Sequence, residues 1–106
     1  MTASPNTPYA GRVDQSQQFS DEQLSRALGR QIAAERTAQG MSQEQLGALA
    51  GGVHKNTIYR YETGEREVTW GAIKKIAAAL QMRPSQLLAA AEERAARDAV
   101  PVTEGL

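Results

Sequence analysis

The chain has 106 residues, of which 41% are hydrophobic, so it is large enough for one small domain but not for two. It contains no cysteine and one histidine, His54, which excludes a disulfide framework, a thiolate metal site and a site built from several histidines. Its 12 basic and 12 acidic residues cancel, so the net charge favours no class of partner.

No segment approaches the roughly 20 consecutive apolar residues that a membrane span requires, and the N-terminal residues lack a signal-peptide pattern. We therefore expect a cytoplasmic protein with no membrane partner. The residue types needed for a nucleophile and its base are not grouped in the sequence, so we expect no enzymatic activity, no cofactor and no metal.

The two ends of the chain differ in composition from its middle. Residues 1–18 carry two prolines and many small polar residues without apolar periodicity, which predicts a flexible N-terminal arm. Residues 19–99 are expected to form the folded domain, and residues 100–106 are expected to form a frayed C-terminal tail.

Two consecutive helices are predicted by the same N-terminal pattern, a capping box enclosed by a hydrophobic staple. The residues that form the two boxes are Ser20 with Gln23 and Ser42 with Gln45. Apolar residues at helical spacing, among them Ile32, give the first helix a buried face that ends at Gly40. The second helix is short and ends near Gly51.

Three further helices are predicted after the second, and the sequence shows no strand pattern. The third runs from about residue 54 to residue 63, with Tyr61 facing the core. Thr69 caps the fourth, whose apolar residues follow the i, i+3, i+4, i+7 spacing from Ile73. Pro84 suits the first turn of the fifth. The predicted fold is all-α with five helices.

The turn between the second and third helices is so short that the two helices must cross steeply. Gly47 lies where a side chain larger than a methyl group would hold them apart, although glycine costs about 1 kcal/mol of helix propensity relative to alanine. Gly51 supplies a residue that accepts a left-handed backbone. A small residue, then a glycine four positions later, then a polar helix is typical of a DNA-binding helix-turn-helix.

Residues 28–88 resemble the Cro/C1-type (XRE-type) helix-turn-helix family of phage repressors and bacterial transcriptional regulators. The stretches that carry the resemblance are LGRQIAAERTAQGMSQEQLGALAG, TIYRYETGER and VTWGAIKKIAAALQMRPSQLL. The resemblance implies a five-helix, lambda-repressor-like domain whose third helix enters the major groove of double-stranded DNA. It also implies a sequence-specific transcriptional regulator, expected to be a repressor that binds a palindromic operator as a homodimer.

The resemblance assigns DNA contacts residue by residue. The expected base contacts come from the third helix: Lys55, Asn56, Thr57, Tyr59 and Arg60. The expected phosphate contacts flank it: Gln43, Thr63 and Arg66. The chemistry agrees, because lysine and arginine donate to guanine and asparagine can form two hydrogen bonds with adenine. Residues 53–61 also contain two cations and no acid.

Two residues around the turn depart from the family pattern. Gly52 looks like an insertion, and His54 stands where the family usually has the serine or threonine that caps the third helix. The missing hydroxyl leaves Asn56 open as either a base reader or the cap of a helix that begins later. The resemblance also implies a structural ion pair of Arg36 with Glu62, which ties the first helix to the end of the third.

The fifth helix is the expected dimer interface. We assign Leu87 to the core and expect Leu88, Ala91 and Ala95 to face a partner copy. The alternative is that the leucines only close the monomer's own core and the alanine-rich extension is a solvated helix. Trp70 is expected to pack at the start of the fourth helix.

A second class of function fits the same helical domain. It could serve mainly as an antitoxin-like or assembly module that binds a protein partner, such as a toxin or another regulator. A gel shift with DNA upstream of the gene, run beside a pull-down for a tight partner, separates this possibility from operator binding.

Overall fold

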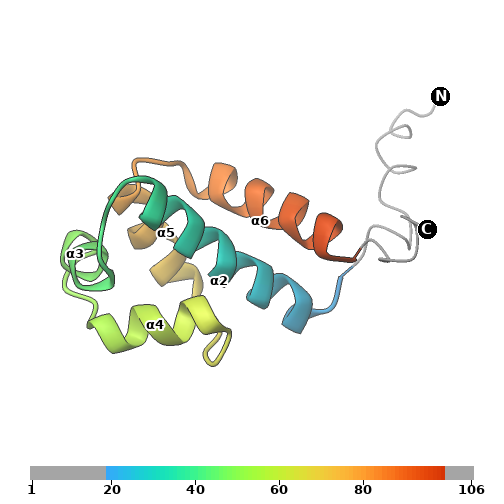
Figure 1. Ribbon diagram of the computed structural model, residues 1–106, viewed down its shortest axis with the longest axis horizontal. Helices are drawn as coiled ribbons and strands as arrows, with labels where there is room; N and C mark the ends of the chain where they lie inside the picture. The colour runs from blue at the N-terminus through green and yellow to red at the C-terminus, as the bar shows by residue number, and fades with distance from the viewer. Residues whose placement is uncertain (1–18, 100–106) are drawn as a thin grey trace.

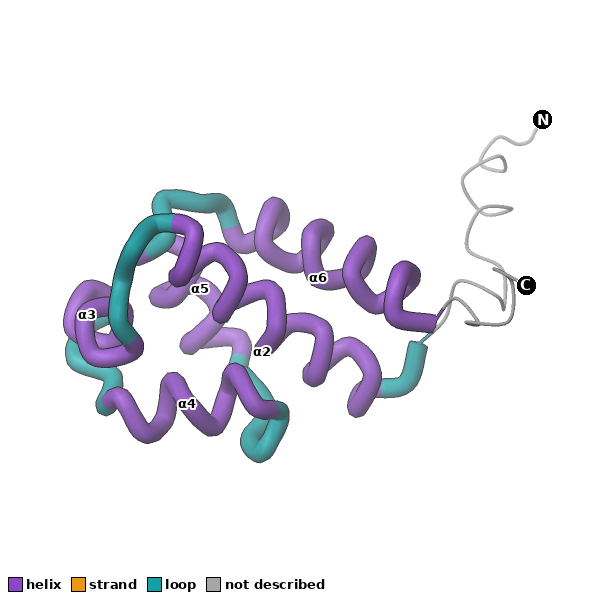
Figure 2. Tube along the Cα trace, in the orientation of Figure 1, coloured by secondary structure: helices purple, strands orange, loops and turns teal. Residues whose placement is uncertain are grey.

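The computed structural model describes residues 19–99, which form five α-helices and no β-strand (Figures 1 and 2). The helices are α2 (Asp21–Ala38), α3 (Gln43–Leu49), α4 (Lys55–Thr63), α5 (Trp70–Ala79) and α6 (Pro84–Ala99). This confirms the predicted all-α fold. The predicted arm and tail lie outside the described residues. In the described part of the chain, no helix is both long and apolar enough to cross a membrane.

The helices begin at the capping residues that the sequence indicates. The N–H groups of Gln23 and Gln45 donate to the hydroxyls of Ser20 and Ser42, and the two glutamine side chains accept from the serine N–H groups, so both capping boxes are complete. Thr69 caps α5 by accepting from a backbone N–H at 3.1 Å. Each cap contributes roughly 1 kcal/mol to stability.

Helix α2 lies in the middle of the molecule, with α6 along one side and α4 on the other (Figure 1). Arg30 donates to Asp98 at 2.8 Å, and Arg94 donates to Gln31 at 2.8 Å. One step forward in α2, from Arg30 to Gln31, corresponds to a step back in α6, from Asp98 to Arg94. The two helices therefore run antiparallel. Helix α4 and helix α6 therefore each cover a different side of α2, as Figure 1 shows.

The core is aliphatic and takes side chains from all five helices. Its largest fully buried side chains are Ile32, Leu46, Ile58, Ile76, Leu80 and Leu87. Burying one such side chain contributes about 1.5–3 kcal/mol. Tyr61 is also buried, as expected from its position on the inner side of α4. The core therefore fixes α4 so that its remaining residues face outward.

Three residues differ in exposure from what the sequence indicated. Ala91 and Ala95 are buried, at 3% and 4% exposure, because α6 packs along α2 over its whole length rather than standing free. Within the monomer these two side chains are covered by its own helices, while the outer side of the extension, which includes Glu93 and Arg97, is exposed to solvent. Trp70, expected to pack, is 57% exposed because it lies in the first turn of α5, outside the core. Leu88 is half-buried at the edge of the core.

Candidate nucleic-acid interface

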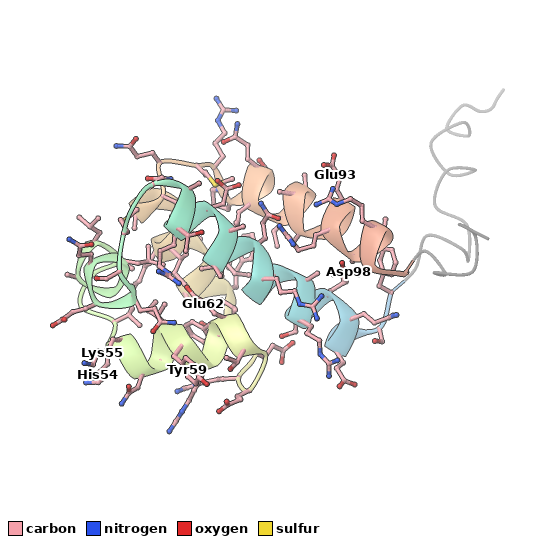
Figure 3. All side chains as sticks on the ribbon, in the orientation of Figure 1. His54, Lys55, Tyr59, Glu62, Glu93 and Asp98 are labelled. Carbon is pink, nitrogen blue, oxygen red and sulfur yellow. The ribbon has the colours of Figure 1, made fainter. Side chains whose placement is uncertain are left out.

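Helix α4 presents one continuous polar side to solvent. Its exposed residues, which we call the recognition face, are Lys55, Asn56, Tyr59, Arg60 and Thr63. The face carries two cations and no carboxylate. Figure 3 shows Lys55 and Tyr59 pointing away from the body of the molecule, on the side opposite Glu93 of α6. Four of the five expected base-reading residues thus lie together, and the fifth, Thr57, is half-buried at the edge.

His54 caps α4, which excludes the alternative in which the helix begins later with Asn56 as its cap. The N–H of Asn56 donates to Nδ1 of His54 at 3.0 Å, and α4 begins at Lys55. A neutral imidazole has one nitrogen that accepts a hydrogen bond, so it can replace the hydroxyl usual at this position. Asn56 therefore lies within the first turn, where its side chain is exposed.

The structure gives another reason for glycine at position 47 than the helix crossing inferred from the sequence. A Cβ at Gly47 would overlap the carbonyl oxygen of Val53, so even a methyl group is too large. The Gly47 carbonyl accepts from the N–H groups of Gly52 and Val53 at 3.0 and 2.9 Å. The constraint therefore comes from the turn folding back onto α3, whereas the Ile58 side chain of α4 would lie at an ordinary contact distance of 3.6 Å.

Two consecutive glycines form the turn that leads from α3 to α4. Gly51 and Gly52 both have φ of +91°, a backbone conformation that other residues rarely adopt. The sequence predicted a left-handed backbone at Gly51 but did not predict the same conformation at Gly52. Two consecutive glycines thus return the chain to α3 at Val53, just before α4 begins.

Glu62 joins α2, α3 and α4 from a buried position (Figure 3). Its carboxylate accepts two hydrogen bonds from Arg36, at 2.7 and 3.1 Å, so the ion pair implied by the family resemblance is present. The side chains of Arg36 and Glu62 are only 14% and 6% exposed. Charge-assisted pairs with this two-bond geometry are strong, and removing one partner from a buried pair costs about 3–5 kcal/mol.

Gln43 belongs to the same network, which the sequence did not indicate. Its side-chain amide, expected to contact a phosphate, donates to Glu62 at 2.9 Å. Arg36 additionally donates to the carbonyl of Met41, in the segment that leads into α3, at 2.8 Å. The first turn of α3 is thereby held in a fixed position relative to α4.

The residues after α4 turn back toward it. Gly64 ends the helix with φ of +81°, and the N–H of Arg66 donates to the carbonyl of Arg60 at 3.2 Å. Thr63 donates its hydroxyl to the same carbonyl at 3.3 Å. Both residues are exposed: Thr63 is the C-terminal residue of the recognition face, and Arg66 follows it in the loop.

Gly29 was missed by the sequence interpretation. It is a buried residue in the middle of α2, and a Cβ there would overlap the carbonyl oxygen of Tyr61. The backbone of α4 therefore passes directly over α2 at this point. A glycine inside a strongly predicted helix, where it lowers helix propensity, was the available signal.

Comparisons with known proteins agree with this geometry. A family described as helix-turn-helix matches residues 32–87, more than half of the chain. The restriction-modification controller protein C.AhdI from Aeromonas hydrophila is 35% identical, with a TM-score of 0.56, over 58% of this chain and 92% of its own. The clp gene regulator ClgR from C. glutamicum shares the fold at 20% identity, with a TM-score of 0.61, over 74% of this chain and 95% of its own. No curated protein matches the sequence.

Proposed function

This chain belongs to the helix-turn-helix family of DNA-binding transcriptional regulators, of the XRE type, and we propose that it represses transcription by binding a palindromic operator as a homodimer. Repression would be steric, because a protein bound across a promoter blocks access to it. The similarity to C.AhdI, a restriction-modification controller protein, supports a regulatory role.

The observation that carries the proposal is the recognition face of α4. Five exposed residues on one helix, two of them cationic and none acidic, form a surface that an anionic groove attracts. An α-helix fits the major groove of B-DNA, which is about 12 Å wide. The backbone of α4 packs directly on α2 at Gly29, and the turn before α4 packs directly on α3 at Gly47, so the position of the face is fixed by two backbone contacts.

Each side chain of the face has a role that follows from its chemistry. Lys55 and Arg60 donate to the O6 and N7 atoms of guanine, and Asn56 forms two hydrogen bonds with adenine. Tyr59 contacts a thymine methyl group or a phosphate, and Thr57 contacts a base from the edge of the face. These contacts read the sequence.

Phosphate contacts at the C-terminal end of the face and beside it set its register on the duplex. Thr63 and Arg66 contact the backbone beyond the C-terminal end of α4, and Gln43 contacts it from the first turn of α3. The amide of Gln43 retains one N–H hydrogen when the other donates to Glu62, so both interactions are compatible.

A dimer is proposed because one recognition helix reads too few base pairs to find a site in a genome. A two-fold axis doubles the site and separates the two recognition helices by about 34 Å, one turn of DNA. The operator is then a palindrome.

The test is a binding titration on DNA sites enriched from the region upstream of the gene. Arg60→Ala and Lys55→Ala should each lower affinity for the best site by roughly 1–3 kcal/mol and relax base preference locally. Arg83→Ala is the matched control, because it removes the same charge from an exposed position in the loop between α5 and α6. Equal losses for Arg60→Ala and Arg83→Ala would contradict the proposed recognition face.

A further inference from the structure

An apolar groove with an acidic rim lies between α2, the α4–α5 loop and α6. Its volume is about 260 Å³. The floor contains buried side chains from three segments, together with one half-buried leucine: Leu28, Val68, Ile73 and Leu88. Three exposed carboxylates stand around it: Asp21, Glu67 and Glu92. We call this surface the acidic groove. An occupant must offer an apolar group and a cation.

The chain itself carries such a group beside the groove. Trp70 is 57% exposed and precedes Ile73 by three residues, so both lie on the same side of α5. Lys74, also exposed, follows Trp70 by one helical turn. Between them a Cβ at Gly71 would meet no atom within 4 Å, which leaves this part of α5 open to close approach.

The opposite side of α5 lies next to the α3–α4 turn. The side chain of Lys75 lies beside the α3–α4 turn, with its Cδ 3.9 Å from where a Cβ at Gly51 would stand. Trp70 and Lys74 are therefore turned away from α3 and toward the side of the acidic groove. Helix α5 contains no carboxylate, so this basic and aromatic surface contrasts with the rim beside it.

We propose that a second copy of this chain is the occupant, with Trp70 and Lys74 of each protomer seated on the acidic groove of the other. The inference rests on the proposed function in its dimeric form and deepens it by naming the interface. A two-fold interface must be self-complementary, with both halves on one side of the subunit. The acidic groove and the surface formed by Trp70 and Lys74 lie next to each other on the subunit, so they satisfy this requirement of a two-fold interface. Packing of groove on groove does not, because it would bring the carboxylates of both rims together.

This interface replaces the stripe expected on the fifth helix. Leu88 and Ala91 remain in it because both line the groove, whereas Ala95 is buried within the monomer and is not part of the groove. The groove includes Glu67 and Val68, in the loop that follows α4. The two-fold axis consequently lies nearer the C-terminal end of each recognition helix, and the N-terminal ends lie farther from it.

The free dimer should be weak. A tryptophan side chain buries about 150–250 Å², so two of them cover only part of the roughly 1,200–2,000 Å² buried in stable interfaces. We expect a monomer–dimer equilibrium in the micromolar range or above, shifted toward dimer by operator DNA because both half-sites hold the protomers together.

The first experiment measures the dimerisation constant of the full chain by sedimentation equilibrium. Trp70→Glu should weaken dimerisation at least tenfold. Leu49→Glu is the matched control, because Leu49 is equally exposed, at 63%, but lies on α3 beyond the proposed interface. Both variants should keep the circular dichroism spectrum of the parent chain. Loss of dimer in both variants, or in neither, would overturn the proposed interface.

The second experiment uses charge reversal, which a folding defect cannot imitate. Lys74→Glu alone and the double variant Glu67→Lys/Glu92→Lys alone should each be monomeric, since like charges then face each other. An equimolar mixture should form a heterodimer, because each cation again meets an opposite rim. A mixture that stays monomeric would overturn the inference.

Binding of the same variants to a half-site separates the two proposals. The proposed function requires every one of them to bind a half-site, since the recognition face is unchanged. If the variants bind a half-site and also dimerise like the parent chain, the proposed interface is rejected but the proposed function is not. A parent chain that binds no DNA would reject the function whatever its oligomeric state.

Discussion

Replacing Gly47 by alanine tests how the turn and helix α3 fit together. The added Cβ meets the backbone carbonyl of Val53, which cannot swing aside as the end of a flexible side chain could. Overpacking costs about 1–3 kcal/mol, and weakening the two hydrogen bonds accepted by the Gly47 carbonyl costs roughly 1 kcal/mol each. Improved helix propensity offsets about 1 kcal/mol. The net destabilisation should be about 2–4 kcal/mol.

The assay is urea denaturation followed by circular dichroism. Gly71→Ala is the matched control, because it brings the same gain in helix propensity at a position where a Cβ meets nothing within 4 Å. It should stabilise the domain by about 0.5–1 kcal/mol. If Gly47→Ala were as stable as Gly71→Ala, the close approach of the turn to α3 would be refuted.

Three other outcomes follow from the same contacts. His54→Ala should lower stability by roughly 1 kcal/mol through loss of the α4 cap, whereas His54→Ser should stay within a few tenths, both measured by urea denaturation. Glu62→Ala should cost about 3–5 kcal/mol in that assay, because it leaves Arg36 buried without its partner. In a salt titration of operator binding, the log–log slope should be steeper than about −3, since each neutralised phosphate contributes about −0.9; a slope near zero would contradict DNA binding.

The features that the sequence predicted well depend on residues close together in the chain. Capping boxes such as Ser20 with Gln23 span three residues, so they are visible without any tertiary contact. The apolar face from Ile73 follows from helical spacing within one helix. These local patterns were sufficient for the fold class and for the five helices.

The errors concern contacts between distant segments. The burial of Ala95 depends on α6 lying along α2, and nothing near residue 95 specifies that neighbour. The exposure of Trp70 depends in the same way on which helices cover α5. For Gly29, the neighbouring backbone belongs to α4, more than 30 residues later in the chain. Helical spacing marks a face as apolar but does not say which surface covers it.

The candidate site was predictable in part. The family resemblance placed the base-reading residues on one helix, and the recognition face contains four of the five. It did not predict that His54 would cap α4, because an imidazole is an unusual cap whose fit depends on the conformation of the turn. It also did not predict the hydrogen bond from Gln43 to Glu62. These two residues are 19 positions apart in the chain and meet only in the folded structure.

The central claim is that the recognition face of α4 reads a DNA sequence. The most direct measurement is selection of binding sites from a random double-stranded DNA library, carried out in parallel with the parent chain and Arg60→Ala. We predict that the parent chain enriches a palindrome with at least one fixed guanine in each half-site, and that Arg60→Ala loses preference at one position while retaining the others. Enrichment of no sequence by the parent chain, or the same motif from both proteins at equal strength, would contradict the account.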